Sequence, residues 1–328
     1  MKDQSIETLR GFAIIFMVAG HIIGESPGNG MKVSDDSAWR YFYFTFEYLR
    51  MPLFTVISGY VYSLWPIGNS EISVFLKGKA RRLLLPMATV GTIYFLMQHF
   101  VPGTNVKFPL SDIWRIYIFP FQHFWFLQSI FLIFISIAII DHFNLIGTFR
   151  NWLLIFLSAI LIRNFMIPSP TNFFSYYDFF FLLPFFLLGC GIKRYESMFS
   201  DVKTIRFATV IFVLSIILQQ LTWFLRLNLS PHEENILSLF VACSGIILLF
   251  YVRKNIDIIS RIGYYAFGIY LFHVFATAGS RIFLMRLGME QYMVMFVIAL
   301  ICGLGFPIIL ELTLSKSKIL KRLLLGLR

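Results

Sequence analysis

The chain has 328 residues, of which 58% are hydrophobic and only 14% are charged, and its mean hydropathy is +0.76. These values exclude an ordinary soluble domain and indicate a polytopic membrane protein. The formal net charge of +11 would suggest a nucleic-acid partner in a soluble protein, but here the basic residues gather in short segments between apolar stretches, as membrane topology requires. Nucleic acid is therefore not expected as a partner, whereas membrane lipids are.

Ten stretches of the chain are long and apolar enough to cross a membrane, given that a hydrocarbon core of ~30 Å takes ~20 residues per helix. The sequence thus predicts an all-α protein of about ten transmembrane helices, with residues 1–328 forming a single domain. The predicted spans are 6–24, 42–65, 83–101, 122–140, 152–168, 176–192, 207–225, 236–252, 262–284 and 292–313. The second contains Glu47, Arg50 and Pro52, and the proline is expected to kink that helix or to start it.

The orientation of these spans follows from their basic residues. The two termini and the segments after the second, fourth, sixth and eighth spans hold 18 Lys and Arg residues, and the opposite side holds 8. Because cytoplasmic segments carry the excess of basic residues, both termini are predicted to be cytoplasmic. This orientation puts Arg10 near the cytoplasmic face and His21 in the outer half of the first span.

Arg10 and His21 are two ionisable residues inside one apolar span. Eleven residues separate them, which on an α-helix is about 20° past three full turns, so both side chains share one face. A cation and an imidazole ~16 Å apart on one stripe could hold the two ends of a long anionic substrate. The alternative is that Arg10 reaches the headgroups and His21 is wetted by the interface.

The chain resembles the acyltransferase-3 family of integral membrane acyltransferases in several stretches that follow the family's order. They are Arg10 and His21 with Gly11, residues 51–60 (MPLFTVISGY), 79–86 (KARRLLLP) and 268–273 (GIYLFH), with a weaker match at 123–127 (HFWFL). The resemblance implies a bacterial inner (cytoplasmic) membrane enzyme. It also implies acetyl-CoA as the donor co-substrate and, as the acceptor, a hydroxyl of a sugar or surface polysaccharide, or of its lipid-linked precursor.

The basic cluster of the third predicted span is a candidate for binding the donor. Lys79 and Arg82 lie at (i, i+3), with Arg81 beside them, and could clamp the phosphates of an acyl-CoA. By the resemblance, Lys79 and Arg82 correspond to the family's basic pair, with lysine at the position where arginine is commoner. The alternative is an ordinary cluster that only sets membrane orientation.

His21 is the candidate catalytic base, because an imidazole can take a proton from an acceptor hydroxyl near neutral pH. The resemblance gives His21 the same essential role. Arg10 is expected to guide or neutralise the donor. Glu7, at (i, i+3) from Arg10, could fix its position, unless it is simply an acid favoured near a helix N-terminus.

Four further residues are candidates for lining a substrate cavity: Arg50, Trp125, Tyr270 and His273. For the aromatic residues, an interfacial belt or helix packing is an alternative explanation. His273 is the stronger candidate because intramembrane histidines are rare.

Two other functions fit parts of the pattern. In a transporter or flippase for a glycan or acyl substrate, Arg10, His21 and His273 would line a translocation path, although the chain shows no repeated halves. An inactive relative of the enzymes is disfavoured because both Arg10 and His21 are present. The sequence contains no metal-ligand cluster, so no metal is expected.

Overall fold

A computed structural model describes residues 3–67, 71–104, 106–166, 171–227, 231–289 and 291–327, except for the side chains of 231–235. All regular elements in these ranges are helical, which confirms the all-α expectation. The α-helices and 3-10 turns (η) are α1 (Gln4–Ile23), α2 (Ala38–Leu64), α3 (Ile72–Phe100), η1 (Leu110–Asp112), α4 (Arg115–Ile118), η2 (Gln122–Phe124), α5 (Trp125–His142), α6 (Phe149–Phe165), η3 (Phe173–Ser175), α7 (Tyr176–Arg194), α8 (Glu196–Phe199), α9 (Val202–Phe224), α10 (Pro231–Val252), α11 (Asp257–Tyr264), α12 (Ala266–Arg286), α13 (Tyr292–Leu314) and α14 (Lys318–Leu325).

Seven helical segments of the described chain are long and apolar enough to cross a membrane, so the protein is a multi-pass membrane protein. They are α1, α3, α9, α12, α13 and the segments Leu110–His142 and Phe173–Arg194, which end in α5 and α7. The other three predicted spans fall on α2, which carries several charged residues, on the 17-residue α6 and on α10. The exact count of ten is therefore not confirmed. Residues 167 and 168, at the end of the fifth predicted span, lie outside the described ranges.

Three predicted boundaries differ from the observed helices. Pro52 lies in the middle of α2 and does not start it. Helix α3 begins at Ile72, so the basic residues 77–82 lie on the helix and not in the segment before it. The ninth predicted span is divided at Tyr265 into the short α11 and the long α12.

Helices α2 and α7 pack closely along each other at the centre of the bundle. A Cβ atom at Gly59 of α2 would collide with the carbonyl oxygen of Phe186, and one at Gly189 of α7 with that of Val56. Only glycine at both positions allows the two backbones to approach this closely, as is common between membrane helices.

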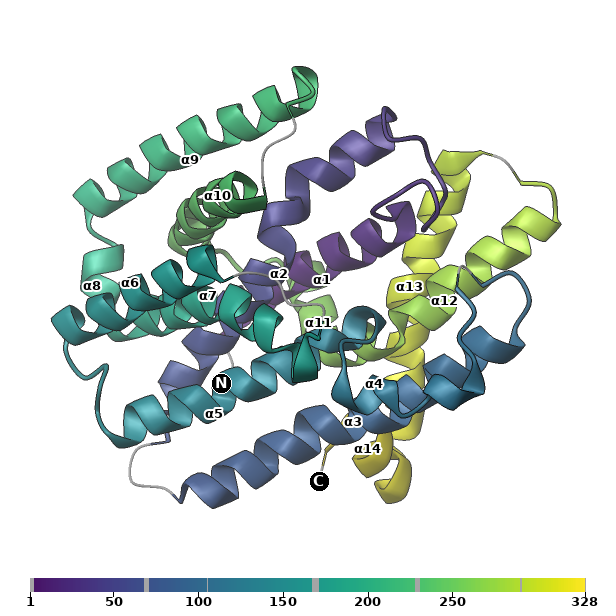
Figure 1. The fold of residues 1–328 in the computed structure, drawn as a ribbon, viewed down its shortest axis with the longest axis horizontal. Helices are drawn as coiled ribbons and strands as arrows, with labels where there is room; N and C mark the ends of the chain where they lie inside the picture. Colours follow the sequence, from purple (N-terminus) through teal and green to yellow (C-terminus); the bar gives the residue numbers. More distant parts are fainter. Residues whose placement is uncertain are drawn as a thin grey trace.

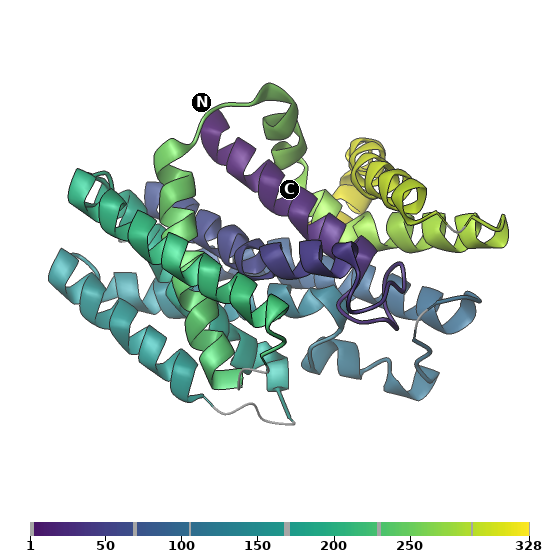
Figure 2. The same cartoon turned by 90° about the horizontal axis from the view of Figure 1, so that it is seen from above.

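The two ends of the bundle are built from different parts of the chain. In Figure 1, α6 and α9 lie on one side and α12 and α13 on the other, with α1 and α2 between them. Figure 2 shows the same separation from above, with the yellow C-terminal helices away from the teal helices of the middle of the chain. The predicted cytoplasmic position of both termini stays a prediction, and its basic residues Lys2 and Arg328 lie outside the described part of the chain.

A partly buried ion pair joins the ends of three helices. Arg194 of α7 donates two hydrogen bonds to the carboxylate of Asp141 at the end of α5, at 2.8 and 2.6 Å. The hydroxyl of Tyr62 on α2 donates a third to the same carboxylate, at 2.7 Å. A carboxylate with three donors is well satisfied, so this cluster fixes the ends of α2, α5 and α7 relative to one another.

Candidate functional site

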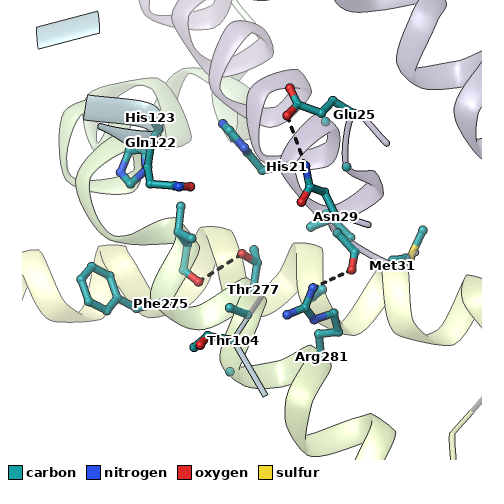
Figure 3. Close-up of a pocket in the computed structure, with 18 of the residues that line it drawn as sticks. His21, Glu25, Asn29, Met31, Thr104, Gln122, His123, Phe275, Thr277 and Arg281 are labelled. Carbon is teal, nitrogen blue, oxygen red and sulfur yellow. Dashed lines mark hydrogen bonds between the residues drawn. The ribbon is translucent and has the colours of Figure 1, made fainter. Parts of the chain in front are cut away.

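A cavity of about 610 Å³ lies at the C-terminal end of α1. Its walls come from the end of α1, the loop that follows it, the middle of α2, the end of α3, η2 and α12. Figure 3 shows His21 and His123 on one wall and Arg281 of α12 beside the loop that carries Asn29 and Met31. Segments far apart in the sequence therefore meet at the end of the first span.

Three imidazole rings form a cluster at this cavity. The ring centroid of His21 lies 5.0 Å from that of His273 and 6.2 Å from that of His123. The centroids of His123 and His273 are 5.1 Å apart. The cluster joins α1, η2 and α12, so it exists only when these three segments are packed together.

The tautomer of His273 follows from its hydrogen bonds. Its Nδ1 lies 3.0 Å from the carbonyl oxygens of both Ile269 and Tyr270. Carbonyl oxygens can only accept, so Nδ1 carries the proton, and Nε2 of the neutral ring is left as an acceptor. Nε2 has no hydrogen-bond partner among the described residues, so His273 presents an unused acceptor inside the cluster.

Exposure separates the roles that the three histidines can take. His273 is 0% exposed and His123 is 6% exposed, whereas the side chain of His21 is exposed to the cavity. A group that takes a proton from a bound substrate must be within hydrogen-bond reach of it. His21 meets this condition. His123 borders the cavity but its Nε2 atom is buried, and His273 does not line the cavity.

The other three residues that were predicted to bind substrate lie at the cavity. Arg50, Trp125 and Tyr270 all line the cavity. The guanidinium of Arg50 lies 4.1 Å from the centre of the Tyr43 ring. The hydroxyl of Tyr270 donates to the carbonyl oxygen of His123, which ties η2 to α12 at the point where the histidines meet.

Arg10 and Glu7 form the ion pair that their spacing predicts. The Nη1 atom of Arg10 lies 2.7 and 2.6 Å from the two carboxylate oxygens of Glu7. The side chain of Glu7 is 5% exposed and that of Arg10 is 25% exposed. Neither lines the cavity, so in this structure Arg10 and His21 do not border one common space.

The three predicted donor-binding residues point in two directions. Lys79 directs its ammonium at the Phe134 ring of α5, 3.7 Å from the centroid. Arg82 lies 4.1 Å from the Phe267 ring centre and donates to the Leu325 carbonyl at 2.5 Å. Arg81 instead lines a separate surface cleft of about 540 Å³ with Lys77 and Arg322. Lys79 and Arg82 thus share a face that Arg81 does not.

The loop between α1 and α2 is fastened by one arginine of α2 and one of α12. Arg40 of α2, 5% exposed, donates to the carbonyl oxygen of Gly24. Arg281 of α12 donates to the carbonyl of Gly30 at 2.7 Å, a bond drawn in Figure 3. These contacts hold the loop as the outer wall of the cavity.

Two residues of the site are missing from the sequence-based candidates. His123 stands in the weaker of the matched stretches, and Arg281 was counted only as a basic residue of the outer side. The position of Arg281 contained a signal, because His273, Thr277 and Arg281 recur every four residues and so lie along one face of a helix. For His123 no periodicity was available, since it lies on a short 3-10 turn.

The three histidines are not arranged as the ligands of a metal ion. In the ranges that the structure describes, no group of three or more His, Cys, Asp or Glu side chains could hold a metal ion. The arrangement that remains is an accessible imidazole with two buried ones behind it, which is suited to accepting and passing a proton.

Three comparisons with known proteins give the family of the chain. No curated protein and no solved structure shows significant similarity to the chain. A family model described as an acyltransferase domain matches residues 3–312, which is nearly the whole chain and includes all three histidines. The chain therefore belongs to the acyltransferase-3 family and is a membrane acyltransferase.

Proposed function

We propose that the protein transfers an acetyl group from acetyl-CoA to a hydroxyl of a sugar, in a surface polysaccharide or its lipid-linked precursor, at the bacterial inner membrane. The observation that carries the proposal is the imidazole of His21, exposed to a cavity of about 610 Å³ and backed by two buried histidines. The acetyl group, the sugar acceptor and the inner membrane come from the family resemblance.

In the proposed reaction His21 is the general base. Its imidazole takes the proton of the acceptor hydroxyl as that oxygen attacks the thioester carbonyl carbon. The new C–O bond forms, the C–S bond breaks, and the coenzyme leaves as a thiolate that takes up the proton from the imidazolium. No metal is needed for these steps, because the thioester already activates the acetyl group.

His273 and His123 are proposed to position His21. The Nε2 atom of His273 is an acceptor without a partner in the described part of the chain, and the ring centre of His273 lies 5.0 Å from that of His21. A hydrogen bond from His21 to this atom would fix the His21 tautomer and leave its other nitrogen free to accept the substrate proton. His273 would act through His21 and not on the substrate.

The donor is proposed to bind from the cytoplasmic side. Lys79 and Arg82 share one face of α3 and are the proposed phosphate ligands, while Arg10, held by Glu7, stands on α1 between the cytoplasmic end and His21. The acceptor would reach His21 from the outer side, where Arg50, Trp125 and Tyr270 line the cavity.

The test is acetyl transfer from radiolabelled acetyl-CoA to glycan in membranes that contain the wild type or a variant at equal expression. His21→Ala is expected to lower the rate by ~10² to 10⁴, the usual contribution of a general base. His142→Ala is the matched control, because His142 is an exposed histidine at the end of α5. Full labelling by His21→Ala would refute the mechanism. Absence of labelling by the wild type would refute the proposed reaction and favour a transport function.

A further inference from the structure

We infer that the acceptor carries an anionic group, a phosphate or a carboxylate, and that Arg281 binds it at the outer end of the cavity. This inference rests on the proposed function and adds the chemical class of the acceptor. It starts from the environment of Arg281, a residue that neither the general-base mechanism nor donor binding uses.

Arg281 is a buried cation with no counter-ion in the ranges that the structure describes. It is 8% exposed, and none of the ion pairs of the described residues includes it. An arginine has five N–H donors and stays protonated. The recorded partner is the Gly30 carbonyl, bonded to Nη1, and Nε is buried with no partner among the described residues. The contact with the loop therefore uses only part of the hydrogen-bonding capacity of this side chain.

A charge at this depth is costly unless something neutralises it. Ionisable residues inside membrane proteins face cavities or partners, because an unpaired charge is poorly solvated there. Arg281 lines the same cavity as His21, and Figure 3 shows both side chains at that cavity. An anion bound in the cavity would supply the missing counter-ion, and a guanidinium fork matches both carboxylate and phosphate.

The charges of the cavity wall favour an anion as well. Among its lining residues, Arg50 and Arg281 are cationic and Glu25 is the carboxylate. Glu25 is exposed and accepts a hydrogen bond from the Asn29 amide at 3.2 Å. The wall therefore carries an excess of positive charge before the histidines are considered.

The spacing along α12 sets where the anionic group would lie. His273 and Arg281 are eight residues apart on one helix, which places them ~12 Å apart along its axis. Thr277, between them, also lines the cavity. The geometry points to an acceptor whose anionic group lies roughly 10 Å from the hydroxyl that reacts at His21.

Binding can be tested without acetyl transfer. The thermal unfolding of the purified protein in detergent would be titrated, at constant ionic strength, with glucose 6-phosphate, glucuronate, farnesyl diphosphate and uncharged glucose. Preference for the phosphosugar or the sugar acid would place the anion on the glycan, and preference for farnesyl diphosphate would place it on a lipid carrier. We expect the anions to stabilise the wild type at concentrations at least about tenfold lower than glucose does.

The variants separate recognition of the anion by Arg281 from a general loss of positive charge on α12. Arg281→Gln is expected to lose the anion response, and Arg286→Gln, an exposed arginine at the end of the same helix, is expected to keep it. If Arg281→Gln does not fold, Arg281→Lys carries the test, because it keeps the charge without the fork and should bind the anions about tenfold more weakly. An equal response to glucose and the anions, or an unchanged anion response in the Arg281 variant, would overturn the inference.

The outcome is independent of the proposed reaction. Anion binding through Arg281 could be found in a protein that transfers no acetyl group, which would refute the reaction alone. Acetyl transfer without anion selectivity would refute the inference alone.

Discussion

The guanidinium of Arg50 lies against the backbone of Gly20, the residue that precedes His21. A Cβ atom at Gly20 would overlap the Nη1 atom of Arg50, so the absence of a side chain at this position lets α2 bring its cation beside the proposed base. This contact links a glycine of the first span to an arginine of the second, and it can be tested directly.

Gly20→Ala is expected to displace the Arg50 head group and to lower acetyl transfer by roughly 10- to 100-fold, as small misplacements in active sites do. The fold should persist, because the colliding atom is the far end of a flexible side chain. Transfer rate and thermal unfolding would be measured together. Gly305→Ala is the matched control, since a Cβ there meets no atom within 4 Å, and it should keep full activity.

His273→Leu is expected to lower kcat by at least about tenfold while the KM values change little, because His273 is buried and touches no substrate in the proposed mechanism. The diagnostic measurement is a double-mutant cycle with His21→Ala. If His273 acts through His21, the double variant should be no slower than His21→Ala alone. Independent, additive losses would show that His273 has only a general structural role.

Arg82→Gln is expected to raise the KM for acetyl-CoA about tenfold, through loss of a charge-assisted contact with a phosphate, and to leave acceptor dependence unchanged. Lys79→Gln should act in the same direction. Arg81→Gln should have a smaller effect, because Arg81 faces a different cleft from that pair. Steady-state kinetics with varied acetyl-CoA would rank the three variants by their KM. Lys254→Gln is the control, because Lys254 is an exposed basic residue. A larger effect at Arg81 would move the donor site to the cleft near α14.

Asp141→Asn is expected to destabilise the protein by roughly 2 kcal/mol, because it leaves the partly buried Arg194 without its counter-ion. A lower thermal unfolding midpoint at unchanged KM values would confirm a purely structural function. The contrasting variant is Glu196→Gln, which breaks the pair with Lys193. The carboxylate of that pair is 53% exposed, so a loss of about 0.5 kcal/mol or less is expected. Equal losses in the two variants would contradict the role assigned to the Asp141 cluster.

Features that lie within one helix could be predicted from the sequence. The pairing of Glu7 with Arg10 follows from a spacing of three residues, and the position of His21 near the end of a span follows from hydropathy. The common face of Lys79 and Arg82, which Arg81 does not share, is also a matter of helical period, although the third helix begins about three turns earlier than hydropathy indicates. The basic residues lowered the apolar score of a segment that is nevertheless helical.

Relations between helices could not be predicted in this way. The meeting of His21, His123 and His273 depends on how α1, η2 and α12 pack, and no period of a single segment contains that information. The expectation that Arg10 and His21 border one space treated α1 in isolation, whereas the only part of α1 that lines the cavity is its C-terminal part. Arg281 was overlooked because a basic residue near a span end is ordinary until its unpaired environment is seen.

The fastened loop after α1 has a consequence for how the acceptor range of this enzyme can change. Two of its anchors, Arg40 at Gly24 and Arg281 at Gly30, bind backbone carbonyl groups, so their hold on these two points does not depend on the side chains of the residues between them. Substitutions or insertions between the two anchors would reshape the mouth of the cavity while His21, on the preceding helix, stays in place. Divergence toward new acceptors is therefore open to this protein through a few loop positions, without any change to its reaction.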